Sequence, residues 1–232
     1  MKSRGENVSE ILSFLASVPM FSTLGESSLL LLAWDCSFRQ LEKGGILFFQ
    51  SDPSDSAYIV CSGNISIVLS SPDGREIVIN EMKRGDLFGE LGILTNKPRS
   101  TCATGRTSCR LLEVPRETFL SVLDAEPQLA LRMLKVMANR LHISGQRESA
   151  LAFMNAQARL ARFLLELEEQ EREKGYVTIS QEELAHHTGL IRQTVAKALG
   201  KWRRAGWLLT GRGRILILNR KALEDLERNS LI

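Results

Sequence analysis

The N-terminal half of the chain is organised around residues 88–101, which read Phe88-Gly89-Glu90-Leu91-Gly92-Ile93-Leu94-Thr95-Asn96-Lys97-Pro98-Arg99-Ser100-Thr101. Gly89 lets the backbone approach a ligand closely and leaves its N–H available to an anion. The Glu90 carboxylate can accept hydrogen bonds from sugar hydroxyls, while the planar Arg99 guanidinium matches phosphate oxygens and Ser100 adds a donor. This combination predicts a site for a cyclic ribose phosphate. The alternative is a glycine-containing turn with a surface Glu–Arg ion pair.

The residues on either side of this segment favour the first interpretation. The segments concerned are Gly85-Asp86-Leu87-Phe88-Gly89-Glu90-Leu91, Pro98-Arg99-Ser100, and the glycine-marked turns in 43–48 and 62–67. Together they resemble the phosphate-binding cassette and strand turns of cyclic-nucleotide-binding domains. The resemblance implies that cyclic AMP is an allosteric effector, bound by Gly89, Glu90, Leu91, Arg99 and Ser100.

Length and composition indicate a globular protein of two domains. The chain has 232 residues, of which 44% are hydrophobic and 25% charged. The longest apolar run, Leu29–Trp34, is too short to span a bilayer, and the N-terminus lacks a signal-peptide pattern. We therefore expect a cytoplasmic protein without a membrane segment. The four cysteines are scattered without metal-ligand spacing, so we expect neither a disulfide framework nor a metal site.

The spacing of apolar residues predicts the elements of the first domain, residues 1–125. Helical spacing in Val8–Val18 and Leu29–Trp34 predicts two short helices. Between Cys36 and Val114 the pattern changes to short apolar runs punctuated by glycines and turns, among them Ser71-Pro72-Asp73-Gly74. This pattern predicts a small antiparallel barrel or jelly roll. Its apolar interior, including Ile67 and Ile79, is expected to receive a purine.

A long helix is expected to begin near Glu126-Pro127 and to form, with the hinge after it, a segment over 126–154. Seven of its residues follow steps of four and three, and this seam turns polar at Ser144 and Glu148: Ala130, Leu134, Met137, Leu141, Ser144, Glu148 and Leu151. This heptad seam predicts pairing with a second copy of the helix, and the alternative is a helix packed on its own barrel. By the resemblance, Ser144 contacts the adenine, while Gly145 stands where a serine makes a further contact.

The C-terminal domain, residues 155–232, carries the pattern of a winged helix-turn-helix. Ser180-Gln181-Glu182-Glu183 is a capping box for a helix that ends at Thr188-Gly189. A second, amphipathic helix begins near Ile191. Its expected apolar face comprises Ile191, Val195, Ala198, Leu199 and Trp202. Two apolar strands flank Gly211-Arg212-Gly213-Arg214, which reads as a basic wing.

Charge and motif point to DNA. Between Glu183 and Glu224 there is no acidic residue but nine lysines and arginines: Arg192, Lys197, Lys201, Arg203, Arg204, Arg212, Arg214, Arg220 and Lys221. The second helix opens with Ile191-Arg192-Gln193-Thr194-Val195, which is similar to the recognition helix of the bacterial cyclic-AMP receptor protein / fumarate–nitrate regulator (Crp/Fnr) family. The DNA contacts this implies are Ser180, Arg192, Gln193, Thr194, Lys197 and Arg212.

The sequence therefore predicts an α+β protein: an N-terminal antiparallel β-roll, a dimerisation helix and a C-terminal winged helix-turn-helix. We expect a homodimeric transcriptional regulator that binds a palindromic operator under control of cyclic AMP, with RNA polymerase implied as a partner by the resemblance. A regulator of the same fold with another effector, a redox signal or no effector is the alternative. A nucleotide-hydrolysing enzyme is disfavoured, because no metal cluster or positioned base accompanies Arg99.

Overall fold

The computed structural model describes residues 4–71 and 76–228 and divides into two compact units, Met1–Arg140 and Leu141–Ile232. Most of the turn predicted at Ser71–Gly74 lies outside the described residues. The boundary between the units falls within the long helix α5, Pro127–Phe153. No helix in the described part of the chain is long and apolar enough to cross a lipid bilayer.

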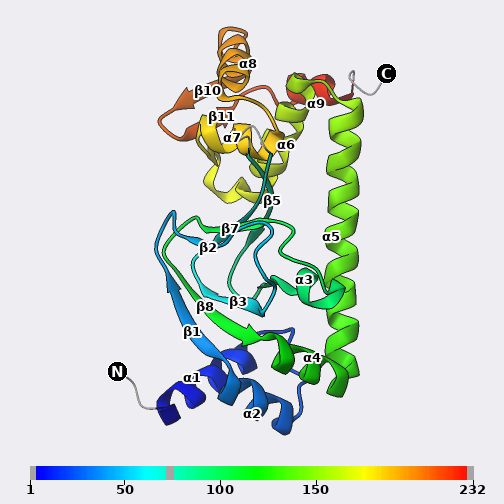
Figure 1. Ribbon diagram of the computed structural model, residues 1–232. Coiled ribbons are helices and arrows are strands. Elements are labelled where there is room, and N and C mark those ends of the chain that lie inside the picture. The colour runs from blue at the N-terminus through cyan, green and yellow to red at the C-terminus, as the bar shows by residue number, and fades with distance from the viewer. Residues whose placement is uncertain (1–3, 72–75, 229–232) are drawn as a thin grey trace. The chain divides into compact units, whose positions relative to one another are not determined.

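The first unit is built on two antiparallel four-stranded sheets (Figure 1). One sheet has the order β1 (Ser37–Leu41), β8 (Cys109–Pro115), β3 (Ser56–Ser62) and β6 (Leu87–Phe88). The other has the order β2 (Ile46–Phe48), β7 (Cys102–Gly105), β4 (Ile65–Ser70) and β5 (Glu76–Met82). Gly63 turns the chain from β3 to β4 at φ +82°, where an added Cβ would lie 2.4 Å from the Ser108 carbonyl oxygen. The antiparallel β-roll predicted from the glycine-punctuated pattern is confirmed.

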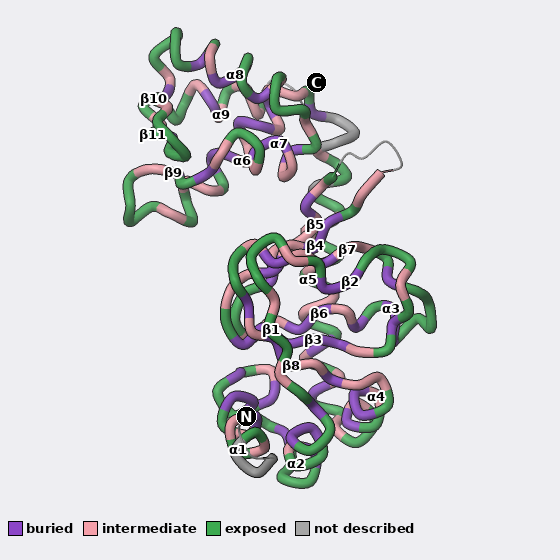
Figure 2. Tube along the Cα trace, turned by 60° about the vertical axis from the view of Figure 1, so that its left-hand side comes forward, coloured by how far each residue is buried: buried purple, intermediate pink, exposed green. Residues whose placement is uncertain are grey.

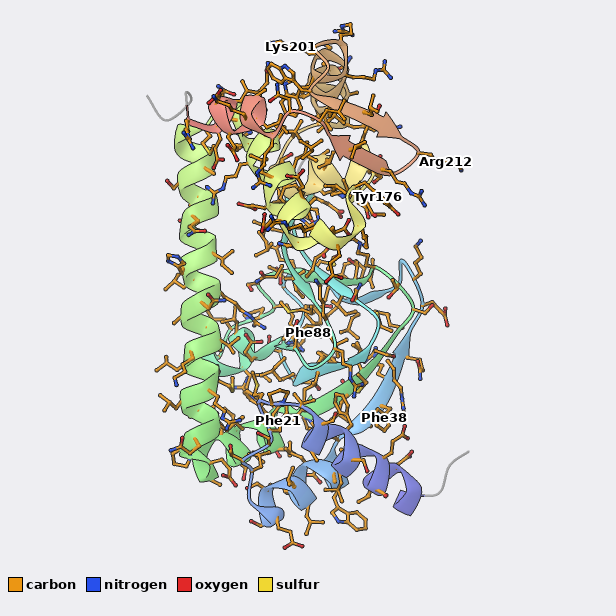
Figure 3. The ribbon with its side chains drawn as sticks, turned by 180° about the vertical axis from the view of Figure 1, so that it is seen from behind. Phe21, Phe38, Phe88, Tyr176, Lys201 and Arg212 are labelled. Atoms are coloured by element: carbon orange, nitrogen blue, oxygen red, sulfur yellow. The ribbon has the colours of Figure 1, made fainter. Side chains whose placement is uncertain are left out.

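Strand β3 of the first sheet is buried on both faces, which explains why it reads as a nearly continuous apolar run. Tyr58 and Val60 belong to the buried cluster inside the roll. Phe88, which Figure 3 labels, is part of the same cluster. Alternate residues of the same strand, such as Ile59, face a second core. That core lies under the helices α1 (Arg4–Ser17), α2 (Glu26–Asp35) and α4 (Arg116–Ala125), which gather beside β1 and β8 (Figures 1 and 2). Period-2 side-chain alternation thus supplies two cores from one strand.

Within the first unit, α5 has a packed side and an exposed side. Leu129 and Met133 are buried in the core under the helices, and Met137 packs against it. Leu134 is 62% exposed. Met137, which the spacing assigns to the heptad seam, therefore contacts the core of its own unit. Beyond the boundary, the seam residue Leu141 is 75% exposed.

The second unit is a helix-turn-helix with a wing. Its elements are α6 (Ala156–Gln170), η1 (Arg172–Lys174), β9 (Val177–Thr178), α7 (Gln181–Thr188), α8 (Arg192–Arg204), β10 (Leu208–Gly211), β11 (Arg214–Ile217) and α9 (Arg220–Arg228). The strands form one antiparallel sheet of order β10-β11-β9. Val195, Leu199 and Trp202 of α8 are buried in a common core with Leu160 and Leu184. The predicted winged helix-turn-helix is confirmed.

Candidate functional site

Gly89 connects strand β6 to the short helix α3 (Glu90–Thr95) and has φ +78°, a conformation that favours glycine. A Cβ at this position would lie 2.8 Å from Nη1 of Arg99 and 3.4 Å from Cδ2 of Tyr58. The close approach of the Arg99 guanidinium to the backbone therefore also requires a residue without a side chain here. The sequence identifies Gly89 for close approach of a ligand, and the structure shows a close approach by Arg99.

Arg99 is only 5% exposed and is held by its own fold. Its Nη1 donates to the Gly89 carbonyl oxygen at 2.7 Å and its Nη2 to the Ser56 carbonyl oxygen at 2.6 Å. The guanidinium also lies over the rings of Phe48 and Tyr58, with its carbon 4.3 and 5.6 Å from their centroids. These contacts fix the position of a positive charge before any ligand arrives.

The buried Arg99 carries one donor that is not used. Within residues 4–71 and 76–228, its Nε has no hydrogen-bond partner. Burial lowers the pKa of Arg99, while the nearby Tyr58 and Asp55 raise it. A buried cation with an unused N–H is unfavourable unless an anion approaches, because desolvation is then not compensated. The residues present therefore fit the phosphate of a nucleotide.

Glu90, the first residue of α3, is 2% exposed and lies close enough to Arg99 for the arginine to lower its pKa. Its Oε1 accepts from Nη1 of Arg140 at 2.9 Å, and Nη2 of Arg140 donates to the Leu87 carbonyl oxygen at 2.6 Å. Burial raises the pKa of Glu90, and Arg140 opposes that rise. A backbone N–H also donates to this carboxylate. A carboxylate can accept about four hydrogen bonds, so it still has the capacity to accept from a sugar hydroxyl.

Arg140 is a site residue that the sequence reasoning missed. It lies on α5, fifty positions after its partner Glu90. The one available signal was its place one helical turn before Ser144, which the resemblance identifies as an adenine contact. An arginine on an amphipathic helix otherwise reads as part of a solvated face.

The structure gives less information about the other predicted nucleotide contacts, Leu91, Ser100 and Ser144. Leu91 and Ser100 are both exposed, on α3 and directly after Arg99. Ser144 belongs to the second unit, where its hydroxyl donates to Oε1 of Glu148 at 3.4 Å. The structure thus brings Gly89, Glu90 and Arg99 together, and the role of Ser144 remains a prediction.

The Glu90–Arg140 pair predicts a pH-dependent stability. A carboxyl whose pKa is raised by folding binds more protons when folded, so stability falls as pH rises through the folded pKa. Removing Arg140 raises the pKa of Glu90 further. We expect Arg140→Met to destabilise the protein by about 1–3 kcal/mol at pH 8, where the buried charge is left alone, and by less at pH 5. Urea unfolding without ligand at both pH values measures this.

A matched control for Arg140→Met is the double variant Glu90→Gln with Arg140→Met, which has no carboxyl to titrate. Its stability loss relative to Glu90→Gln alone should not depend on pH over this range. An equal loss for Arg140→Met at pH 5 and pH 8 would show that Glu90 does not depend on Arg140 for its charge.

In the second unit, the capping box fixes the start of α7. The Glu183 N–H donates to Oγ of Ser180 at 3.1 Å, and the Ser180 N–H donates to Oε2 of Glu183 at 2.8 Å. Gly189 ends the helix at φ +65°. The Ser180 hydroxyl, predicted to contact DNA, is therefore already used as a helix cap.

The start of α8 differs from the prediction at one residue. The spacing assigns Ile191 to the apolar face, but it is the N-cap, with extended φ −83° and ψ 145°, and is 56% exposed. The helical spacing does not apply to it because the helix begins at Arg192. The four other residues assigned to that face, Val195, Ala198, Leu199 and Trp202, are buried.

Most of the predicted DNA contacts of the second unit are exposed on α8 or on the wing. Arg192, Gln193 and Lys197 are exposed on α8, with Thr194 half-buried between them. Arg212 extends from the tip of the hairpin between β10 and β11, and Lys201 extends from α8 (Figure 3). A helix-turn-helix whose second helix exposes basic and amide side chains, beside a basic wing, has the charge and shape needed to bind the DNA backbone and a groove.

Comparisons with known proteins agree with this geometry. The profile of the Cyclic nucleotide-binding domain matches residues 38–126, and that of the Crp-like helix-turn-helix domain matches residues 158–226. The CRP-like cAMP-activated global transcriptional regulator of Mycobacterium tuberculosis is 31% identical over 200 residues, which cover 84% of this chain and 89% of that protein.

Solved structures show the same fold. The c-di-GMP responsive global regulator CLP of Xanthomonas campestris superposes with a TM-score of 0.73 at 24% identity, covering 83% of this chain and 99% of that one. A transcriptional regulator of the CRP family from Thermus thermophilus gives a TM-score of 0.66 at 26% identity, covering 84% of this chain and 98% of that one.

Proposed function

This chain belongs to the Crp/Fnr family of DNA-binding transcriptional regulators, and on that premise we propose that it is a homodimeric regulator whose operator affinity is controlled by cyclic AMP. The observation that carries the proposal is the buried Arg99, whose Nε has no partner in the described residues and whose charge is near enough to the buried Glu90 to act on its pKa. A fixed cation and a paired carboxylate suit the phosphate and the ribose hydroxyl of one ligand.

Residues 1–125 form the proposed nucleotide-binding domain, 126–154 the dimerisation helix and hinge, and 155–232 the DNA-binding domain. When bound, cyclic AMP supplies the anionic phosphate and the ribose hydroxyl that these side chains recognise. Arg99 holds the phosphate, Gly89 lets it approach the backbone, and Ser100 adds a donor. Glu90, held by Arg140, accepts the hydroxyl. Leu91 and Ser144 are proposed to contact the rest of the nucleotide.

Cyclic AMP is favoured among effectors by the name of the Mycobacterium tuberculosis relative, which is cAMP-activated. The alternative is another effector. Gly145 offers no side chain next to Ser144, and a neighbour of the same fold is named as c-di-GMP responsive. Glu90 and Arg99 together argue for a ligand with both a free ribose hydroxyl and a phosphate.

A calorimetric titration of the full-length protein with cyclic AMP, cyclic GMP and c-di-GMP distinguishes these effectors. We expect saturable binding of cyclic AMP in the micromolar range or tighter, at least about −8 kcal/mol, and weaker binding of the other two. If another nucleotide binds more tightly, that nucleotide and not cyclic AMP is the effector. If none of the three gives a heat of binding, the proposal of nucleotide control is wrong.

Dimerisation is supported by the exposed apolar residues of α5. Leu134 and Leu141 are separated by one heptad, and both are largely exposed. A twofold partner using the same residues would cover them. A twofold dimer places its two α8 helices in successive major grooves, about 34–36 Å apart, so a palindromic operator is expected. We also propose that the regulator works in the cytoplasm, where it would meet the bacterial chromosome and RNA polymerase.

The base preference of α8 is a further expected result. Glutamine pairs bidentately with adenine N6 and N7, whereas glutamate accepts from cytosine N4. Gln193 is exposed near the start of α8, next to Arg192. Sites selected from random DNA by the wild type should therefore carry adenine at the pair read by Gln193, and sites selected by Gln193→Glu should carry cytosine. Recovery of the same base by both proteins would mean that residue 193 does not read it.

A further inference from the structure

One carboxylate interrupts the basic surface of the helix-turn-helix. Glu183 is used in the capping box, and the following forty residues hold no other acidic residue before Glu224. Glu182 is different, because its side chain is 60% exposed. An exposed negative charge close to DNA phosphates weakens binding, so a function for it has to come from some other contact.

That contact is Arg192. Glu182 is the second residue of α7, whose first turn is fixed by the capping box, and its Oε2 lies 3.7 Å from Nη1 of Arg192. Its Oε1 lies 3.9 Å from Nε2 of His186, one turn further along α7. The Arg192 side chain is itself 70% exposed. An exposed ion pair of this kind contributes little to stability. Its main effect is to orient the Arg192 guanidinium.

The surroundings leave Arg192 a choice of directions. Glu182 and Arg192 line a hollow of about 310 Å³ together with Gly211 and Gly213 of the wing. The wing also lines the hollow with Thr210 and Ile215, and none of these four wing residues carries a charge that could pair with the guanidinium. An arginine without the Glu182 contact could bind any phosphate here, which is non-specific, or a base edge, which is specific.

We propose that Glu182 is a positioning residue for base readout. The Glu182 carboxylate offsets the charge of Arg192 and so weakens its attraction to phosphates. It also orients the Arg192 guanidinium so that the remaining N–H groups of Arg192 donate to guanine O6 and N7. This inference rests on the proposed function of α8. A neutral pair adds no counterion release on random DNA, whereas a bidentate contact with guanine is still available to it. Glu182 therefore lowers non-specific affinity and increases discrimination.

The test measures DNA affinity by fluorescence anisotropy with the full-length protein and saturating cyclic AMP. Three duplexes are compared, each at several salt concentrations: a selected operator, the same operator with the guanine that Arg192 is proposed to read replaced by another base, and a random sequence. The variants are Glu182→Gln, Arg192→Ala and their combination. Glu173→Gln is the control, because it removes an exposed carboxylate from η1, outside the helix-turn-helix. Unfolding midpoints verify that all variants are folded.

Glu182→Gln should bind random DNA more tightly and steepen the plot of log affinity against log salt by about 0.9, the equivalent of one additional phosphate contact. Preference for guanine should fall about fivefold or more, since one bidentate contact supplies at least that discrimination. In the Arg192→Ala background, Glu182→Gln should leave base preference unchanged. Glu173→Gln should match the wild type.

Three results would overturn the inference. If Glu182→Gln tightens all three duplexes by the same factor, with and without Arg192, then Glu182 acts only through general charge repulsion. If the wild type shows no guanine preference that Arg192→Ala removes, the proposed readout by α8 fails and the inference fails with it. Guanine preference that depends on Arg192 but is unchanged in Glu182→Gln refutes the role of Glu182 alone.

Discussion

Arg99→Ala should weaken cyclic AMP binding by roughly 2–5 kcal/mol, equivalent to about thirtyfold to several thousandfold in Kd. The physical reason is that the phosphate would enter a buried position without the cation that compensates its desolvation. The structure holds that guanidinium with two backbone carbonyl oxygens and two aromatic rings. Calorimetric titration of the variant with cyclic AMP measures the loss.

Two comparisons make the Arg99 experiment specific. Arg39→Ala removes an arginine that is half-exposed in the same unit and lies 3.6 Å from Glu113, so it should bind cyclic AMP as the wild type does. Glu90→Gln should weaken binding less than Arg99→Ala, because the amide can still accept a hydrogen bond from the ribose hydroxyl. Unchanged affinity in Arg99→Ala would refute the assignment of residues 88–101 as a phosphate-binding cassette.

Leu141→Asp should convert the protein to monomers and lower its affinity for a palindromic operator by about 10²–10⁴-fold. Two aspartates would meet across a twofold seam, where burying unpaired like charges is strongly unfavourable. A monomer then binds one half-site without the gain from linking two. Sedimentation velocity reports the oligomeric state, and anisotropy with a full palindrome and a single half-site reports the affinity.

Leu131→Asp is the matched control for the seam. Leu131 is also an exposed leucine of α5, but it lies off the heptad positions of Ala130 and Leu134. We expect Leu131→Asp to remain dimeric, and we expect Leu134→Asp to behave as Leu141→Asp does. If both seam variants sediment as dimers, the heptad interpretation is wrong and another surface makes the dimer.

Local signals in the sequence were sufficient for much of the fold. The capping box at Ser180 and Glu183 uses neighbours three positions apart, and the structure shows both of its hydrogen bonds. Glycine at 89 is needed because of a positive φ and a close contact. Such features depend on residue type and spacing, so a sequence reveals them without knowledge of the tertiary fold.

Features that depend on long-range packing were not visible in the same way. The Glu90–Arg140 pair joins residues fifty positions apart, and no local pattern brings them together. Met137 fits a heptad, but packing on its own unit also uses steps of three and four, so spacing alone could not separate the two roles. Ile191 has the spacing of the apolar face of α8, but the helix begins one residue later, at Arg192. A sequence pattern does not place a helix end to within one residue.

The most direct test of the account is the coupling between effector and DNA. The measurement is the Kd of the full-length protein for its selected palindrome, by fluorescence anisotropy, without nucleotide and with saturating cyclic AMP. We predict that cyclic AMP tightens binding by about 5–150-fold, the usual range of an allosteric coupling, and that Arg99→Ala abolishes this change at the same nucleotide concentration. The same Kd with and without cyclic AMP in the wild-type protein would contradict the account.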